Sequence, residues 1–332
     1  MKKIKLLSIP YLLGSAFLLL VASCASVRNM TIDQLYPAEA TFPETISYVA
    51  VVNNMVHIPA LSDKVLRKGM LYGDGKLFAE QFSAALADNA YFSQIMICDS
   101  ALRAADDEQL DRLLSPREIQ ELSEGLGADM LLSLDGLTLN VKRESFYYPG
   151  IPEPFPMLRV DTYAVLRAYS SARSTPMMSV VLSDSLFWNL GAINSELDVV
   201  KEATSHMSAL ITARIAPQWK PVDRIYFDGV CAEMRDGAVL MRENSWSEAK
   251  EIWIRLYNKS KKKLKVKTAF NIALVCELEG NISEARQWLQ KASKDAKDGS
   301  EEKYLIMIYS EVLQKREADV AKLNLQMNRF VK

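Results

Sequence analysis

The chain has 332 residues and a formal net charge of −1, so it has no excess of basic residues for binding nucleic acid. Hydrophobic residues make up 49% of the sequence and charged residues 24%, which excludes a disordered chain and is enough to bury a core. This length predicts two domains.

The N-terminus has the pattern of a secretory signal. Lys2, Lys3 and Lys5 precede an apolar run from Leu6 to Leu20, which ends in small residues. A permanent membrane span needs about 20 apolar residues, and this run is shorter. We therefore expect residues 1–23 to be removed, which leaves 309 residues and lowers the formal charge from −1 to −4 because the three lysines are lost.

The expected cleavage site ends on a cysteine. Val21-Ala22-Ser23-Cys24 resembles the lipobox of bacterial lipoproteins, and this resemblance implies that Cys24 is acylated and anchors the chain in a membrane. The alternative is an ordinary structural cysteine. Ala25 in place of an aspartate favours the outer membrane, and the absence of an acidic run after Cys24 favours its periplasm-facing leaflet.

After a tether over residues 24–45, strands and helices alternate as expected for an α/β domain over residues 46–220. The predicted strands are 46–54, 91–100, 128–141, 160–172 and 177–189, and the predicted helices are 76–89, 115–127 and 195–216. Ser115-Pro116-Arg117-Glu118 gives the second helix an N-cap, a proline at its first position and a capping-box glutamate. The order βαβαβββα predicts an α+β fold with a mixed sheet.

This order resembles the small α/β domain at the N-terminus of TolB and of the curli secretion lipoprotein. The local match is "EIQELSEGLGADMLLSL", in which a Leu-Gly-Ala-Asp turn leads into a buried strand. The resemblance implies a part used in assembly or recognition, by analogy of fold alone.

The C-terminal part, residues 221–332, is predicted to be all-helical and contains an internal repeat. Ser-Glu-Ala occurs at 247–249 and at 283–285, a period of 36 that is close to the 34-residue tetratricopeptide unit. The second copy resembles that unit through the residues Asn271, Ala273, Gly280, Ala285, Leu289 and Ala292; the first resembles it through Gly237, Ala249, Trp253 and Leu256. An ordinary helical bundle with a chance repeat is the alternative.

The whole chain resembles a lipoprotein family of Bacteroidota to which no activity is assigned. The resemblance covers the lipobox, the segment "YPAEATFPETISYVAVVNN", and the repeats with "WSEAKEIW" and "AFNIALVCELEG". It implies no catalytic residue in this chain.

The residues that catalysis and metal binding use are scarce. His206 is expected to have a structural role on its helix, and His57 has no partner at metal-ligand spacing. No phosphate-binding glycine loop, nucleophile elbow or zincin helix is present. Cys98, Cys231 and Cys276 are expected to be buried thiols, with a Cys231–Cys276 bridge as the alternative. We expect no enzyme, no metal and no cofactor, although a hydrolase with paired carboxylates is a remaining alternative.

Two surfaces are candidates for binding a partner. The first is the connection 143–156, which contains Phe146, Tyr147, Tyr148 and Phe155 among four prolines; alternatively, these rings fold back on the sheet as a lid. The second is the inner face of the second repeat, with Lys267, Phe270, Asn271, Leu274 and Glu277, where related repeats use such an asparagine to bind a ligand's backbone. Packing of this face against the rest of the chain is the alternative.

The sequence therefore predicts a non-enzymatic, lipid-anchored adaptor that binds a protein of the envelope through its repeats. The alternative is an accessory lipoprotein that binds cell-wall polymer or another glycan through the aromatic connection. Nucleic acid is not an expected partner.

Overall fold

The computed structural model describes residues 27–56, 69–104, 111–147, 149–150, 152–193, 195–229 and 231–328. The described residues form two compact units, and each is treated by itself. The sheet unit comprises residues 36–218 and 323–328, and the repeat unit comprises residues 27–35 and 219–322.

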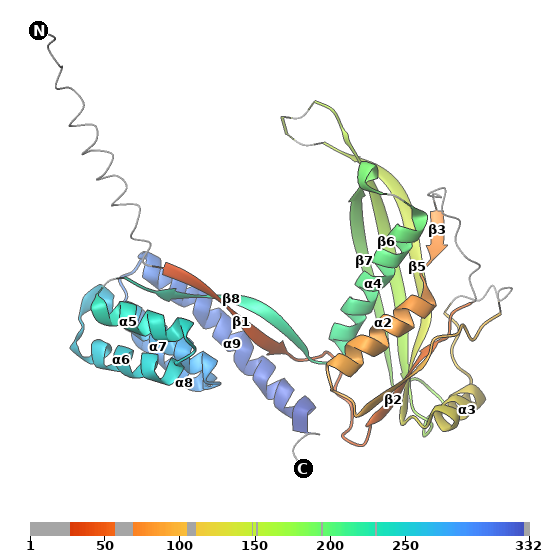
Figure 1. The fold of residues 1–332 in the computed structure, drawn as a ribbon, viewed down its shortest axis with the longest axis horizontal. Coiled ribbons are helices and arrows are strands. Elements are labelled where there is room, and N and C mark those ends of the chain that lie inside the picture. The colour runs from red at the N-terminus through yellow and green to blue at the C-terminus, as the bar shows by residue number, and fades with distance from the viewer. Residues whose placement is uncertain are drawn as a thin grey trace, which may run out of the picture. The chain divides into compact units, whose positions relative to one another are not determined.

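A six-stranded mixed sheet forms the centre of the sheet unit (Figure 1). Its main path runs in the order β4 (Gln94–Cys98), β2 (Tyr48–Asn53), β5 (Met130–Phe146), β6 (Phe155–Tyr169) and β7 (Met178–Asn189), and β3 (Gly69–Tyr72) pairs with the distal half of β5. Strand β2 is parallel to both its neighbours, and the remaining pairs are antiparallel. The predicted mixed sheet is thus confirmed; β3, which has only four residues, was not predicted because so short a strand has no clear period.

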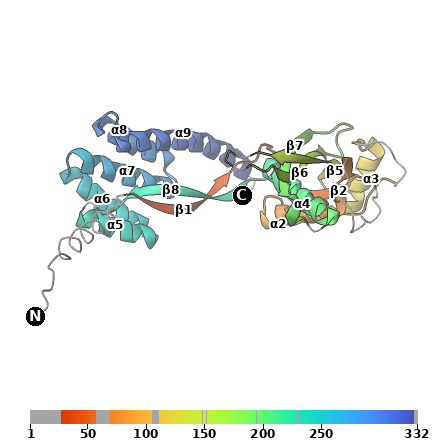
Figure 2. The ribbon, with the colours of Figure 1, turned by 90° about the horizontal axis from the view of Figure 1, so that it is seen from above.

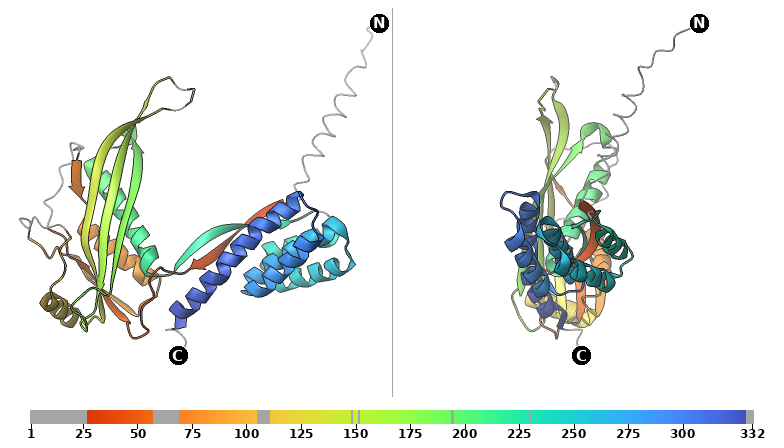
Figure 3. Two further views of the ribbon diagram at one scale, coloured as in Figure 1. Left: turned by 180° about the vertical axis from the view of Figure 1, so that it is seen from behind. Right: turned by 90° about the vertical axis from the view of Figure 1, so that its left-hand side faces the viewer.

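Helices lie on both faces of this sheet. Successive residues of β2 point to opposite faces, so Val49 and Val51 pack with α2 (Gly75–Asp88) and α4 (Glu196–Ile215), whereas Ala50 and Val52 pack with α3 (Pro116–Leu126). Figures 1 and 3 show α2 and α4 crossing the same face. The distal half of β5, β6 and β7 is therefore covered on one face only.

The capping signals start and end α3 as the sequence predicts. The Ser115 hydroxyl accepts a hydrogen bond from the Glu118 N–H, and the Glu118 carboxylate accepts one from the Ser115 N–H. Gly127 ends the helix at φ 62°, a left-handed conformation that favours glycine.

A bulge in β5 keeps the apolar face of this long strand in register with the helices. The pairing with β6 shifts between Leu134 and Gly136. Leu132 and Leu134 before the shift, and Leu137 and Leu139 after it, are therefore all buried on the side of α2 and α4. Without the extra residue, the distal half of the strand would turn its leucines toward solvent.

The repeat unit combines five helices with a two-stranded sheet (Figure 2). The strands are β1 (Val27–Tyr36) and β8 (Gln218–Phe227), and the helices are α5 (Ala232–Arg242), α6 (Trp246–Lys259), α7 (Lys262–Leu278), α8 (Ile282–Asp295) and α9 (Glu301–Met327). Residues 27–36, which the sequence placed in a tether, are instead β1. Strand β8 was not predicted because Pro221 interrupts its pattern, but an edge strand tolerates a proline.

Small residues of the repeat lie where helices approach closely. Ala249 and Ala285, at matching positions of the two Ser-Glu-Ala copies, are both fully buried. Gly237 of α5 faces the buried indole of Trp253, and a Cβ at Gly237 would overlap that ring. The small residues of the repeated pattern are therefore explained by close helix packing, and a tetratricopeptide fold stays a prediction.

Candidate functional site

The signal sequence and Ala25 lie outside the described residues, and so do three candidate site residues: the lipidation site Cys24, His57 and Tyr148. Of the remaining cysteines, Cys276 is buried and Cys98 and Cys231 are partly exposed. All three are free thiols, so the alternative Cys231–Cys276 bridge is not formed. No helix in the described part of the chain is both long and apolar enough to cross a membrane.

The inner face of the second repeat is occupied by the chain itself. The side chain of Asn271, 0% exposed, binds the backbone of β8: the Phe227 N–H donates to Asn271 Oδ1 at 2.8 Å, and Asn271 Nδ2 donates to the Phe227 carbonyl at 2.8 Å. Phe270 is also buried, with its ring centroid 5.2 Å from those of Phe227 and Tyr309. Asn271 does bind an extended backbone, but that backbone is the chain's own.

A buried ion pair fixes the same face to β8. The Arg224 guanidinium donates to the Glu277 carboxylate at 2.7 and 2.9 Å, and Arg224 also donates to Gln34 of β1 at 2.8 Å. The Tyr309 hydroxyl of α9 donates to Glu277 at 2.6 Å. Burial, together with the Glu277 charge, raises the pKa of Tyr309 well above its ordinary value. These contacts join α7, α9, β1 and β8.

The other two members of the predicted binding set are buried as well. Lys267 Nζ lies 3.6 Å from Glu302 Oε1 and 4.9 Å from the centre of the Phe227 ring, and Leu274 is fully buried. The prediction of an open peptide groove at Lys267, Phe270, Asn271, Leu274 and Glu277 is therefore wrong for this structure. The sequence could not show it, because the strand that fills the face was not predicted.

The aromatic connection is shorter than expected, and the side chains of Phe146, Tyr147 and Phe155 are exposed. Strand β5 extends to Phe146 and β6 begins at Phe155, so these two residues are opposite each other at the end of the hairpin. The Tyr147 side chain is 75% exposed and Phe155 is 41% exposed. The sequence missed Phe187 of β7, which is 46% exposed and stacks edge-on against Phe146 at 5.7 Å. We call Phe146, Tyr147, Phe155 and Phe187 the aromatic end.

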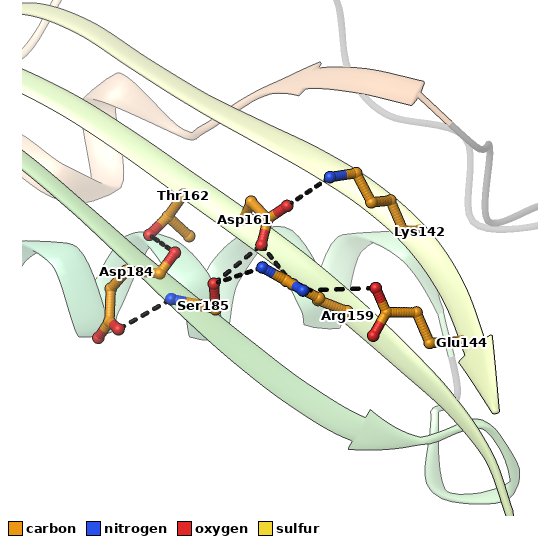
Figure 4. A network of polar contacts seen from close by, with 7 residues as sticks. All are labelled: Lys142, Glu144, Arg159, Asp161, Thr162, Asp184 and Ser185. Atoms are coloured by element: carbon orange, nitrogen blue, oxygen red, sulfur yellow. Dashed lines mark hydrogen bonds and ion pairs between the residues drawn. The ribbon is translucent and has the colours of Figure 1, made fainter. Parts of the chain in front are cut away.

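We call the face of β5, β6 and β7 that no described helix covers the open face. Next to the aromatic end, this open face has a network of paired charges (Figure 4). Asp161 of β6 accepts hydrogen bonds from Lys142 at 2.7 Å, Arg159 at 2.6 Å and Ser185 at 2.8 Å. Arg159 also lies 3.4 Å from Glu144, and its guanidinium carbon lies 5.8 Å from the centre of the Phe187 ring. Alternation along the strands places all these side chains on one face.

The pairing determines the charge states of the network. The hydrogen bond from Lys142 is the main cause that lowers the pKa of Asp161 to about 2, and Asp161 in turn raises the pKa of Arg159 above its ordinary value. Both groups are thus ionised at neutral pH. His206 of α4 lies 2.7 Å from Asp184 of β7, and this contact lowers the pKa of Asp184. His206 is thus partly buried and paired with a carboxylate, and its structural role stays a prediction.

A second polar cluster, which the sequence missed, is buried between β2 and β5. Asp135 at the bulge accepts hydrogen bonds from Ser133 at 2.5 Å, Asn54 at 2.8 Å and Arg167 at 2.5 Å. Burial raises the pKa of Asp135, while these hydrogen bonds act in the opposite direction. Among the described residues, the adjoining cavity measures about 10 Å³, which is enough for one water molecule and too small for a larger ligand.

Of the surfaces described here, the open face and the aromatic end are the ones that can contact a partner. The rings supply apolar contact area with little entropy to lose, and Arg159 places a cation beside them. The residues of the predicted repeat surface cannot do so while β8 is in place.

Solved structures similar to this chain come from several bacteria. A minor lipoprotein from Acinetobacter baumannii is 8% identical, with 52% of this chain and 92% of that chain covered and a TM-score of 0.27. A PelC dodecamer from Paraburkholderia phytofirmans is 12% identical (56% and 98% covered, TM-score 0.26), and the lipoprotein GNA1162 from Neisseria meningitidis is 17% identical (50% and 97% covered, TM-score 0.23). No curated protein matches the chain.

Two family descriptions match the sequence. Residues 235–315, which contain most of α5 to α9, match the Domain of unknown function DUF6340. Residues 46–227, which run from just before β2 to the end of β8, match the Domain of unknown function DUF8603. The second match spans more than half of the 332 residues, and the chain therefore belongs to the DUF8603 family.

Proposed function

We propose that the protein is a lipid-anchored envelope protein that acts as a non-enzymatic adaptor and binds a protein partner through the aromatic end of its sheet unit. The observation that carries the proposal is the group of exposed rings Phe146, Tyr147, Phe155 and Phe187 beside Arg159. Aromatic residues and arginine are the residue types enriched in protein interfaces.

The anchor rests on the sequence Val21-Ala22-Ser23-Cys24. One acyl chain binds a membrane weakly, whereas the several chains of a lipoprotein hold it durably. Cells grown with labelled palmitate should yield a labelled protein, and Cys24→Ser should abolish the label and release the protein from the membrane fraction. An unlabelled wild-type protein would refute the anchor.

The contact surface requires a test that spares the fold. Replacing Phe270 or Asn271 would disturb buried packing, so the informative variant is Tyr147→Ser with Phe187→Ser, at exposed positions. After crosslinking in intact cells, we expect the wild-type chain to retain specific envelope proteins and this variant to lose them. Trp219→Ser, which removes a 66% exposed ring from the repeat unit, is the matched control and should retain them.

Glycan binding by the same surface is the second candidate. It is favoured by the position of the rings beside ordered hydrogen-bonding groups, Glu144, Arg159 and Asp161, since stacking on a ring and polar contacts at its edge suit a sugar. Retention of the wild-type chain on isolated cell-wall polymer, lost in the Tyr147→Ser, Phe187→Ser variant, would favour this candidate over a protein partner.

Three finer assignments belong to the same proposal: a tetratricopeptide-like repeat, a sheet unit related to the TolB N-terminal domain, and an outer-membrane location in a Bacteroidota envelope. The buried Ala249 and Ala285 support the first. Ala25 after the acylated cysteine supports the location. Fractionation of inner and outer membranes tests that location directly.

A further inference from the structure

The repeat unit has a surface pocket, whose residues are far in the sequence from those of the aromatic end. A pocket of about 440 Å³ lies where the start of α7, the end of α8 and the start of α9 meet. Its polar lining consists of Lys262, Lys263, Asp295, Lys297, Ser300 and Glu302. The pocket is large enough for a small ligand.

Both acidic groups of this pocket are already neutralised. Glu302, whose side chain is 4% exposed, lies 2.9 Å from Lys263 Nζ and 3.6 Å from Lys267 Nζ. Asp295 lies 3.7 Å from Lys265 Nζ. A cation entering the pocket would therefore compete with lysines that are held in place.

Two lysines of the pocket have no such partner. In the described part of the chain, no carboxylate lies within ion-pair distance of Lys262 or Lys297, and both side chains are exposed. Lys261 and Lys294 are further exposed lysines close by in the sequence. Over residues 261–267 and 294–302 there are seven lysines and four carboxylates, Asp298 and Glu301 included, so this region has a net positive charge.

The start of α7 adds to this positive potential. Lys262 and Lys263 occupy the first turn, no acidic residue is present there, and no side chain caps the helix. The N-terminal end of a helix has a partial positive charge, so lysines there are unfavourable unless an anion is near. The local sequence breaks the usual capping rule beside a pocket that has room for that anion.

We propose that this pocket binds a phosphate group, from a soluble phosphate ester or from an anionic lipid headgroup. Lys262 and Lys297, which both line the pocket, would donate charge-assisted hydrogen bonds to it. The proposal goes beyond the adaptor function, because it concerns the repeat unit and needs neither Cys24 acylation nor a contact at the aromatic end.

Site-specific acetylation of lysines, measured by mass spectrometry, tests the proposal on the full chain in detergent. Inorganic pyrophosphate should slow acetylation of Lys262 and Lys297 by about tenfold, since two charge-assisted hydrogen bonds hold the ligand there. Lys201 and Lys315, exposed lysines outside the pocket, should react unchanged. Sodium chloride at matched ionic strength is the control for screening.

A membrane arm separates the two sources of phosphate. The same chain is mixed with nanodiscs of phosphatidylcholine with or without phosphatidylglycerol. Protection by pyrophosphate supports a soluble ligand, and protection by phosphatidylglycerol alone supports a lipid headgroup. Absence of protection in both arms, or equal protection of Lys201 and Lys315, would overturn the proposal.

Variants provide a second measure. Lys262→Gln with Lys297→Gln should weaken pyrophosphate binding in calorimetry by about tenfold or more, whereas Lys201→Gln with Lys315→Gln, which removes the same charge, should leave it unchanged. All four side chains are exposed, so the fold is expected to survive in both variants. If both double variants bound pyrophosphate equally weakly, the binding would be a general effect of positive charge, and the proposed site would be refuted.

Discussion

The two surfaces that the sequence marks for partner binding occupy opposite environments in the structure. The repeat face around Asn271 is buried beneath β8 and α9, whereas the aromatic end is open and Tyr147 is 75% exposed. Both have residue types suited to recognition. The difference teaches that residue type alone does not identify a binding surface, because an extended segment of the same chain can occupy that surface and make the contacts that a partner would make.

The largest effect should follow from breaking the buried ion pair. Glu277→Gln leaves the Arg224 guanidinium without its compensating charge, and we expect the repeat unit to lose about 3–5 kcal/mol of stability. Urea unfolding followed by tryptophan fluorescence measures it, since Trp219, Trp246, Trp253 and Trp288 lie in this unit. Glu251→Gln, which breaks an exposed helix pair, should cost less than about 0.5 kcal/mol.

A somewhat smaller loss should follow Asn271→Ala. The substitution leaves the N–H and carbonyl of Phe227 buried without partners, at a cost of about 2–4 kcal/mol. The same fluorescence experiment applies, with the exposed Asn258→Ala as its control. If Asn271→Ala left stability unchanged, β8 would not be held as described and the face could open to a partner.

On the open face, the effect should be small and dependent on pH. The pKa of Asp161 is lowered to about 2, so its contribution is fully present above the unfolded value near 3.9 and is lost as pH falls toward 2. Asp161→Asn should therefore cost roughly 0.5 kcal/mol at pH 7 and nearly nothing at pH 2, because this exposed pair is screened by solvent. Unfolding monitored by circular dichroism at several pH values measures the difference; a constant cost would contradict the pairing with Lys142.

The smallest effect on stability is expected for Tyr147→Ser, below about 0.5 kcal/mol, because the side chain makes little buried contact. The thermal midpoint should stay within a degree or two of the wild type, while partner capture falls. A marked loss of stability would mean that the ring packs on the sheet as a lid, which was the alternative for this connection.

The sequence by itself determined the elements that depend on local signals. The Ser115 capping box, the end of α3 at Gly127, the buried strand at 48–53 and the helical repeat around Ala249 and Ala285 all lie where the pattern predicts them. Each is set by neighbouring residues within one or two turns or by a simple period, which a sequence displays directly. The signal sequence and the acylation of Cys24 also rest on local signals, and they stay predictions.

Only the tertiary structure decided which surfaces are free. The hydrogen bonds between Asn271 and Phe227 join residues 44 positions apart, and that between Arg224 and Gln34 joins residues 190 apart. The cluster around Asp135 likewise depends on a bulge that brings β2, β5 and β6 together. Contacts between residues so far apart produce no periodic pattern in the sequence, because the burial of a face depends on which distant segment of the chain packs against it.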